Sequence, residues 1–210
     1  MTTFMTVIVI CLIILYIADQ LCDIYAPQIK GYWGEKRVAK ILDSLPKEQY
    51  RVINNVLIKK GDNETAQIDH IVISNYGIFS IETKNYKGLI TGSEFAQQWT
   101  KYMGKKKYKF QNPIRQNYGH IKALEKALEL KKDNIISLIV FAQGAKLKVS
   151  CKTPVVNNSS LNKTIKSYQD QKFSAEQVDT IVNKINALNI YTKQAMREHV
   201  KQVKKKQRQD

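Results

Sequence analysis

Two acids and a lysine, Asp69, Glu82 and Lys84, lie in a segment whose apolar pattern predicts a β-hairpin. The predicted strands are Gln67–Ser74 and Gly77–Lys84, and side chains alternate along a strand, so Glu82 and Lys84 share one face. The expected register sets Asp69 opposite Glu82, where Cβ atoms are roughly 5 Å apart. Two carboxylates this close repel each other, and a divalent cation between them would remove the repulsion. Mg²⁺ prefers such oxygen ligands and is the expected ion, with Mn²⁺ as an alternative.

This register depends on the turn that joins the two strands. Asn75 and Tyr76 form the expected two-residue turn because Asn tolerates positive φ, and Ser74 then pairs with Gly77. A three-residue loop containing glycine would change the pairing, and an ordinary surface ladder with scattered charges is the alternative interpretation. Apolar residues expected on the opposite face support the sheet: Ile68, Val72, Phe79 and Ile81.

The surrounding residues resemble a known family. Asp69, followed after twelve residues by Glu82-Thr83-Lys84, is similar to the Asp…Glu-x-Lys core of the restriction-endonuclease-like nuclease superfamily. Further motifs, in the same order, resemble the nuclease-related domain (NERD) family over about residues 31 to 130: Gly31-Tyr32-Trp33-Gly34-Glu35, Gln67-Ile68-Asp69-His70, Gly77-Ile78-Phe79, Asn85-Tyr86-Lys87-Gly88, Trp99 and Asn112-Pro113-Ile114-Arg115-Gln116. Ile68 stands where the superfamily pattern has proline.

The resemblance implies a role for each of these hairpin residues. Asp69, Glu82 and the backbone carbonyl of Thr83 would hold the metal. Lys84 would stabilise the attacking water or the negative charge that grows on the phosphorane. Metal ions neutralise an anionic phosphodiester, activate water and stabilise the leaving oxygen, and a lysine adds fixed positive charge.

The resemblance also implies roles for two helix residues. Glu35 matches an acid of the first helix that can hold a second metal or orient water, although any acid is favoured in the first turn of a helix. Gln116 matches a glutamine that touches substrate or metal-bound water, although it could be an exposed helix residue. Of the histidines, His70 is expected to be packed and hydrogen-bonded and His199 to be solvated. His120, one helical turn from Gln116, is expected on a helix surface, although it could line the cleft.

The N-terminal segment predicts a membrane anchor at residues 1–25. No charged residue precedes Asp19, and residues 4–18 are mostly Val, Ile and Leu. Eighteen helical residues extend about 27 Å, which suits a bilayer core. A cleaved signal peptide fits less well because no basic residue precedes the run and Tyr16 stands where cleavage after Ala18 needs a small residue. A buried core helix is the remaining alternative.

Basic residues follow the predicted anchor and none precede it, so the positive-inside rule sets the rest of the chain in the cytoplasm. Cys11, Cys22 and Cys151 show no paired spacing, as expected in a reduced compartment. The expected location is therefore the cell membrane, with a single pass and a cytoplasmic domain. The basic residues after the anchor are Lys30, Lys36, Arg37 and Lys40.

The charge of the chain predicts a polyanionic partner. The formal net charge is +16, and the first 29 residues contribute only two acids, so the rest of the chain carries +18. Such a balance is typical of proteins that bind nucleic acid, with DNA expected here, or anionic lipid.

The element pattern predicts an α/β fold. Helices are expected at 34–45 and 113–130, and the apolar run 135–141 is typical of a strand covered on both faces. The resemblance implies a restriction-endonuclease-like core, a central mixed sheet flanked by helices. The expected layout is a transmembrane anchor at 1–25, a NERD-like nuclease domain at 31–150, and a C-terminal extension at 151–210 that ends in a basic helical tail.

A second hairpin is expected at residues 98–110, where aromatic residues and lysines alternate. Bases can stack on aromatic rings while lysines hold phosphates, although one packed aromatic face and one solvated lysine face is the simpler interpretation. The aromatic residues are Trp99, Tyr102, Tyr108 and Phe110, and the candidate nucleic-acid-binding lysines are Lys101, Lys105, Lys106, Lys107 and Lys109.

The C-terminal extension gives weaker signals. Ser174-Ala175-Glu176-Gln177 fits a capping box. Residues 192–210 are helix-prone and end in a basic cluster, which is typical of a solvated tail but could bind nucleic acid or the anionic leaflet. The cluster comprises Lys201, Lys204, Lys205, Lys206 and Arg208.

These observations predict a membrane-anchored, metal-dependent nuclease-like protein that hydrolyses phosphodiester bonds. Three alternatives stay open: a catalytically weak nucleic-acid-binding module, a basic scaffold at the membrane surface, and a periplasmic or secreted nuclease if the leader is cleaved. A module that only binds nucleic acid would not need Asp69 and Glu82 to face it.

Overall fold

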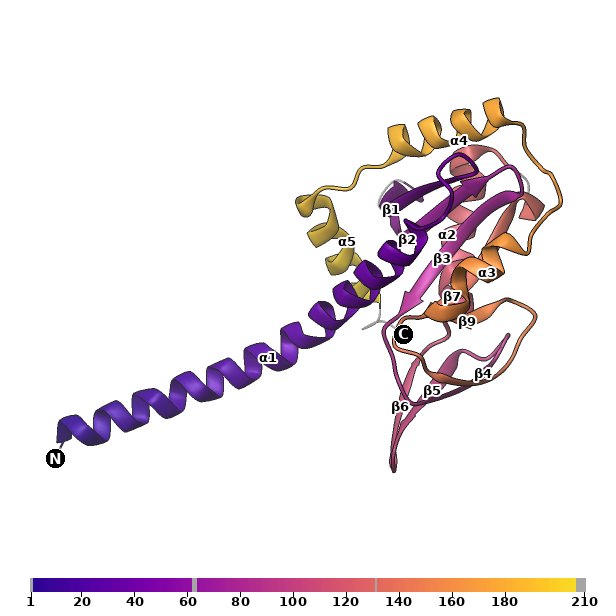
Figure 1. The fold of residues 1–210 in the computed structure, drawn as a ribbon. Coiled ribbons are helices and arrows are strands. Elements are labelled where there is room, and N and C mark those ends of the chain that lie inside the picture. The colour runs from indigo at the N-terminus through magenta and orange to yellow at the C-terminus, as the bar shows by residue number, and fades with distance from the viewer. Residues whose placement is uncertain (1, 62–63, 131, 207–210) are drawn as a thin grey trace.

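The computed structural model describes residues 2–61, 64–130 and 132–206, and two sheets flanked by helices form its mixed α/β body (Figure 1). The sequence also predicts a turn at Lys60–Asn63, of which Asp62 and Asn63 lie outside the described residues, as does the basic residue Arg208. The larger sheet has the order β1 (Tyr50–Lys59), β2 (Thr65–Ser74), β3 (Gly77–Lys84), β7 (Ile135–Phe141) and β9 (Val155–Asn157). The smaller sheet has the order β6 (Lys106–Gln111), β5 (Gln98–Met103), β4 (Leu89–Ser93) and β8 (Lys146–Ser150).

The β2–β3 hairpin has the expected register from its turn to His70, and the ladder ends one residue before the expected Asp69–Glu82 pair. Ser74 pairs with Gly77, and the antiparallel ladder continues to His70 and Ile81. The expected reason for the turn is wrong, because positive φ falls on Gly77, at 138°, and not on Asn75. Glycine adopts such a backbone without a Cβ penalty, so the residue that opens the second strand supplies the freedom that was assigned to the turn.

Apolar residues fill both faces of the larger sheet. Alternate residues of β2 and β3 face a cluster covered by α2 (Pro113–Leu128) and α4 (Ala175–Leu188). Val72, Phe79 and Ile81 pack on the other face, beneath the C-terminal part of α1 (Thr2–Leu42) and α3 (Leu161–Lys166). Ile68, expected beside Val72, belongs to the first cluster instead. The period-2 pattern of two hydrophobic strands thus produces a sheet with helices on both sides.

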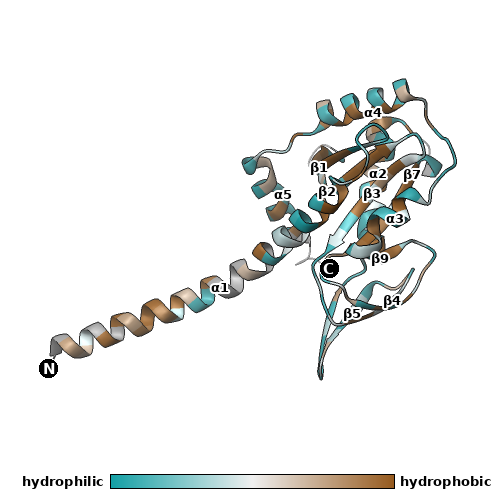
Figure 2. Cartoon of the chain, in the orientation of Figure 1, coloured by the Kyte–Doolittle hydropathy of each residue, from teal (hydrophilic) through white to brown (hydrophobic). Residues whose placement is uncertain are grey.

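Helix α1 is longer than expected, because one 41-residue helix joins the apolar N-terminal segment to the helix that packs on the sheet. It extends away from the body in Figure 1, and its outer part is mostly apolar in Figure 2. The window Phe4–Leu21 has a mean hydropathy of 2.3 and is long and apolar enough to cross a membrane, a test that a signal sequence also passes. None of that window is buried, which disagrees with a buried core helix.

Helix α2 begins at an asparagine that also fixes the neighbouring loop. Asn112 is fully buried, and its side-chain oxygen accepts a hydrogen bond from the Ile114 N–H while Pro113 occupies the first turn. The Asn112 amide donates to the carbonyls of Ser93, Glu94 and Ala96. This one side chain therefore ties the start of α2 to the end of β4.

We expect Asn112→Ala to lower the free energy of unfolding by about 2 kcal/mol, because it removes an N-cap and takes the amide donor away from the partly buried carbonyls of Glu94 and Ala96. Urea unfolding of the full-length chain in detergent, followed by circular dichroism, measures the change. Asn112→Ser keeps a capping oxygen but loses the amide, so its loss should be intermediate. Equal stability of the alanine variant and the wild type would contradict this account of the α2 start.

The last helices return to the body of the protein. Ser174 and Gln177 form the expected capping box at the start of α4. Helix α5 (Lys193–Lys206) then lies beside β2, where Nδ1 of His199 is 2.7 Å from the Thr65 hydroxyl. The expectation that His199 is solvated is therefore wrong, since its helix packs against the sheet.

Candidate functional site

The predicted hairpin residues converge at one end of β2 and β3. The backbone N–H of Thr83 donates to Oδ2 of Asp69 at 2.8 Å. Nζ of Lys84 donates to Oε1 of Glu82 at 2.7 Å and to Oε1 of Gln116 at 2.9 Å. Glu82 and Asp69 are 2% and 9% exposed. Four predicted side chains, from two strands and helix α2, thus surround one buried point.

Helix α2 carries Gln116 to this point because a buried polar network fixes it to the sheet. The Asn117 amide donates to the Ser80 carbonyl and the Ser137 hydroxyl, and the Ser80 hydroxyl donates back to the Asn117 side-chain oxygen. All three hydrogen bonds measure 2.8 Å. Paired polar groups of this kind hold a helix in one position, since an unpaired group would be costly to bury.

Helix α1 brings Glu35 to the same site. Gly34 is buried against Asn85, and a Cβ at position 34 would lie 2.5 Å from the Asn85 Cβ, so only glycine permits this approach. Burial raises the pKa of the Glu35 carboxyl, as does the Glu82 charge. The Lys84 charge opposes this effect. Glu35 is therefore electrostatically part of the site, as the resemblance implied.

The carboxyls repel one another strongly. Burial raises the pKa of Asp69 well above its usual range, and the charges of Glu82 and Glu35 raise it further. The Thr83 N–H and Lys84 only partly offset this. Burial would lower the pKa of Lys84, but Glu82 and Asp69 outweigh it and raise that pKa, so the amine stays charged. The site therefore holds more negative than positive charge whenever its acids are ionised.

His120 lies at the site, where the sequence favoured a helix-surface position over a place in the cleft. Its side chain is only 12% exposed, and its Nδ1 lies 3.5 Å from Oε2 of Glu82, beyond a good hydrogen bond. Burial lowers the pKa of His120 more than the Glu82 charge raises it. The available signal was its spacing of one helical turn from Gln116, which sets both on one face. His70, in contrast, is packed as expected, with Nδ1 2.7 Å from the Asn54 side-chain oxygen.

The donor set suits a divalent cation, although it does not form a complete cage. Within the described residues, no group of three or more His, Cys, Asp or Glu side chains is arranged to hold a metal ion. Oε2 of Glu82 is nevertheless buried and has no hydrogen-bond partner among those residues. A bare, buried carboxylate oxygen beside Asp69 and Glu35 is the environment that a hard cation would stabilise.

Two hollows reach residues of the site. The larger, about 610 Å³, is lined by Asp69 and Gln67 of β2, Gln116 and His120 of α2, and His199 of α5. The second, about 480 Å³, is lined by Thr83, Lys84 and Lys101 together with Lys30 of α1. Lys84 is therefore reached from one hollow and Asp69 from the other.

The lysines of the second hairpin divide into two groups. Lys101 lies over the rings of Tyr86 and Tyr108 and lines the same hollow as Lys84. Lys105, Lys106, Lys107 and Lys109 are exposed on the hairpin and do not line the site. Trp99 is fully buried and Phe110 packs in the same cluster, so these aromatics have the packing role that the simpler interpretation gave them.

We expect acid to loosen α5 from the wall of the larger hollow. Burial lowers the pKa of His199, so its neutral form is favoured when α5 is docked. The docking stabilisation is complete above the ordinary histidine pKa of about 6.5 and is lost as pH falls below it. Limited proteolysis by proteinase K, normalised to its rate on casein, should show faster cleavage of α5 in acid. His199→Gln should remove this pH dependence, and an equal dependence in that variant would contradict the prediction.

Comparison with known proteins identifies the family of this chain. The profile of the nuclease-related domain, NERD, matches residues 30–142, and the chain belongs to this family. It is also similar to a Bacillus anthracis protein described only as uncharacterised, with 40% identity over 181 residues, 84% of this chain and 85% of that protein. No solved structure matches the chain.

Proposed function

We propose that this NERD protein is a metal-dependent nuclease that hydrolyses phosphodiester bonds in nucleic acid, with DNA as the first substrate to test. The observation that carries the proposal is the meeting of Asp69, Glu82, Glu35 and Lys84 at one end of the larger sheet. Family membership supports nuclease chemistry. A restriction-endonuclease-like core is part of this proposal, and the mixed sheet between helices is consistent with it.

In the proposed site, Asp69, Glu82 and the Thr83 carbonyl would hold Mg²⁺ or Mn²⁺, with Glu35 beside them. The bound ion would neutralise the phosphodiester and make a coordinated water more acidic. Lys84 supplies fixed positive charge where negative charge grows in the transition state, and its bond to Gln116 sets the direction of its amine. Gln116 lines the larger hollow, where it can also contact a substrate phosphate.

The charge distribution supports a nucleic-acid substrate. Lys101 and Lys30 line one hollow of the site, and Lys60 and Arg115 line the other. These cations would offset the negative charge that Asp69 and Glu82 present to a phosphate chain. The exposed hairpin lysines, Lys105, Lys106, Lys107 and Lys109, extend the basic surface outward in the same proposal.

The test is cleavage of supercoiled plasmid by the full-length chain in detergent. We expect nicked product with Mg²⁺ and none with a chelator, with restoration when Mg²⁺ is returned. Binding of plasmid without any nicking, under every divalent ion tested, would reject the enzyme and favour the catalytically weak binding module. Sedimentation with anionic vesicles and no affinity for DNA would favour the membrane-surface scaffold instead.

We further propose that Phe4–Leu21 is an uncleaved membrane anchor that leaves the rest of the chain in the cytoplasm. The apolar, unburied window supports a span, and the basic residues that follow it support the orientation. The basic tail would then lie close to the anionic leaflet. A C-terminally tagged chain should stay in membranes after alkaline extraction and resist protease added outside intact cells. A shortened chain released outside the membrane would show that the segment is a signal peptide.

A further inference from the structure

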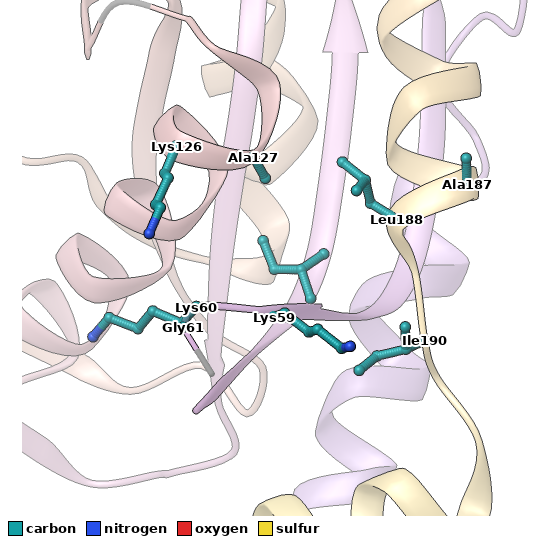
Figure 3. A pocket seen from close by; sticks show the side chains of 9 residues that line it. Lys59, Lys60, Gly61, Lys126, Ala127, Ala187, Leu188 and Ile190 are labelled. Carbon is teal, nitrogen blue, oxygen red and sulfur yellow. The ribbon is translucent and has the colours of Figure 1, made fainter. Parts of the chain in front are cut away.

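A separate hollow of about 480 Å³ lies next to the candidate site, and we call it the flanking pocket (Figure 3). Its apolar surface comes from the end of β1, the last turns of α2 and α4, and the segment after α4. Pockets of this size hold small organic groups. The apolar lining residues are Ile58, Ala127, Ala187, Leu188 and Ile190.

The rim of the flanking pocket is positively charged. Lys59, Lys60 and Lys126 line it, and no acidic residue is among the described residues of its lining. All three lysines are exposed, so their charges are available to a ligand. An apolar surface inside a ring of amines suits a ligand with a flat, weakly polar part and negative charges beside it. A nucleotide has this composition, since its base is apolar on both faces and its phosphates are anionic.

The flanking pocket adjoins the larger hollow of the candidate site. Lys60 lines both the pocket and the larger hollow above Asp69. Helix α2 also contributes to both: Arg115 and Gly119 line the hollow, and Lys126 lines the pocket. Gly119 and Lys126 are two helical turns apart, about 11 Å along the axis. A strand that places one phosphate in the larger hollow can therefore reach Lys126 with a nucleotide further along the same strand.

Gly119 keeps this route open. No atom lies within 4 Å of the position a Cβ would take there, so packing does not require glycine. Glycine inside a helix costs about 1 kcal/mol relative to alanine. Gly119 lines the larger hollow. Because it has no side chain, a nucleic-acid strand can pass close to the helix backbone between Arg115 and Lys126.

We propose that the flanking pocket holds the base of a nucleotide that lies along the strand from the one that is cut, with Lys60 and Lys126 on the phosphates beside that base. This inference rests on the proposed nuclease function and narrows its expected substrate. A base can enter the pocket only when it is unpaired, so the preferred substrate is a single strand or the frayed end of a duplex.

The test introduces one charge into the pocket of the full-length chain. Ala187→Glu sets an acid on the exposed last turn of α4, and Ala187→Gln is the control of the same size without the charge. Fluorescence anisotropy measures binding of labelled oligothymidylates of increasing length, with Ca²⁺ in place of Mg²⁺. Wild type and Ala187→Gln should gain affinity at the length that reaches the pocket. Ala187→Glu should lose that gain, about tenfold or more.

A second variant tests the phosphate contact by its dependence on salt. Lys126→Gln should lower the magnitude of the slope of log affinity against log salt for single strands by about 0.7, because one phosphate contact fewer means that one counterion fewer is released on binding. Lys166→Gln removes the same charge from α3, on the opposite face of the sheet, and should leave the slope unchanged. Duplex DNA without ends should bind all these variants alike, because its bases stay paired.

The outcomes separate the inference from the function on which it rests. If wild type cuts plasmid, and Ala187→Glu and Lys126→Gln bind every length as wild type does, the pocket takes no part and the inference is wrong. If Ala187→Glu weakens binding of closed duplex and of single strands equally, the charge acts at a distance and the base pocket is also wrong. A wild type that neither binds nor cuts nucleic acid would reject both proposals.

Discussion

Replacing Asp69 with asparagine is expected to reduce plasmid hydrolysis by about a thousandfold or more. The proposed metal contributes several kcal/mol to the transition state, and each 1.36 kcal/mol is a factor of ten in rate. Asparagine keeps an oxygen that can accept from the Thr83 N–H, which now donates to Asp69 at 2.8 Å. The local fold should therefore survive, and the loss should come from the missing charge.

A stability measurement distinguishes this prediction from simple unfolding. Burial and two neighbouring acids destabilise the ionised form of Asp69, so Asp69→Asn should raise the melting temperature when no divalent ion is present. A ligand that binds the folded state raises that temperature in proportion to its occupancy. Mg²⁺ should therefore stabilise wild type and leave Asp69→Asn almost unaffected. Equal stabilisation of both chains by Mg²⁺ would show that Asp69 does not hold the ion.

Local reasoning was sufficient for the hairpin, because register follows from a two-residue turn and an alternating pattern. It set Asp69 beside Glu82 and Lys84 before any tertiary contact was known, and the Thr83–Asp69 and Lys84–Glu82 hydrogen bonds agree with that arrangement. The positions of Glu35 and Gln116 came from the family resemblance, since their helices reach the site only through Gly34 and the Asn117 network.

Two histidines show where sequence reasoning was insufficient. His120 was expected on a helix surface, yet its side chain is buried beside Glu82 because α2 presents that face to the sheet. His199 was expected in solvent, yet α5 folds back to β2. In both cases the outcome depends on how a helix docks, and a pattern of charges and apolar residues within one helix does not specify the partner surface. The continuous α1 has the same cause, since nothing in its sequence requires a break between span and core.

Replacing Lys84 with methionine is expected to lower kcat by about a hundredfold to a thousandfold, which is the usual effect of removing one preorganised charge from a transition state. Methionine matches the length of the aliphatic stem but cannot donate to Glu82 or Gln116. The matched control is Lys101→Met, because Lys101 lines the same hollow but lies over the rings of Tyr86 and Tyr108 and forms no ion pair with an acid of the described residues.

The division between kcat and KM decides the role of Lys84. A lysine that acts only on bound phosphate in both ground and transition states would raise KM and leave kcat unchanged. Lys101→Met should show that pattern, with a weaker salt dependence of binding. Lys84→Met should lower kcat with little change in KM, because the Lys84 amine is held in one orientation by Glu82 at 2.7 Å and by Gln116 at 2.9 Å. If both variants change KM alone, Lys84 only binds substrate, and the proposed charge stabilisation at this amine is wrong.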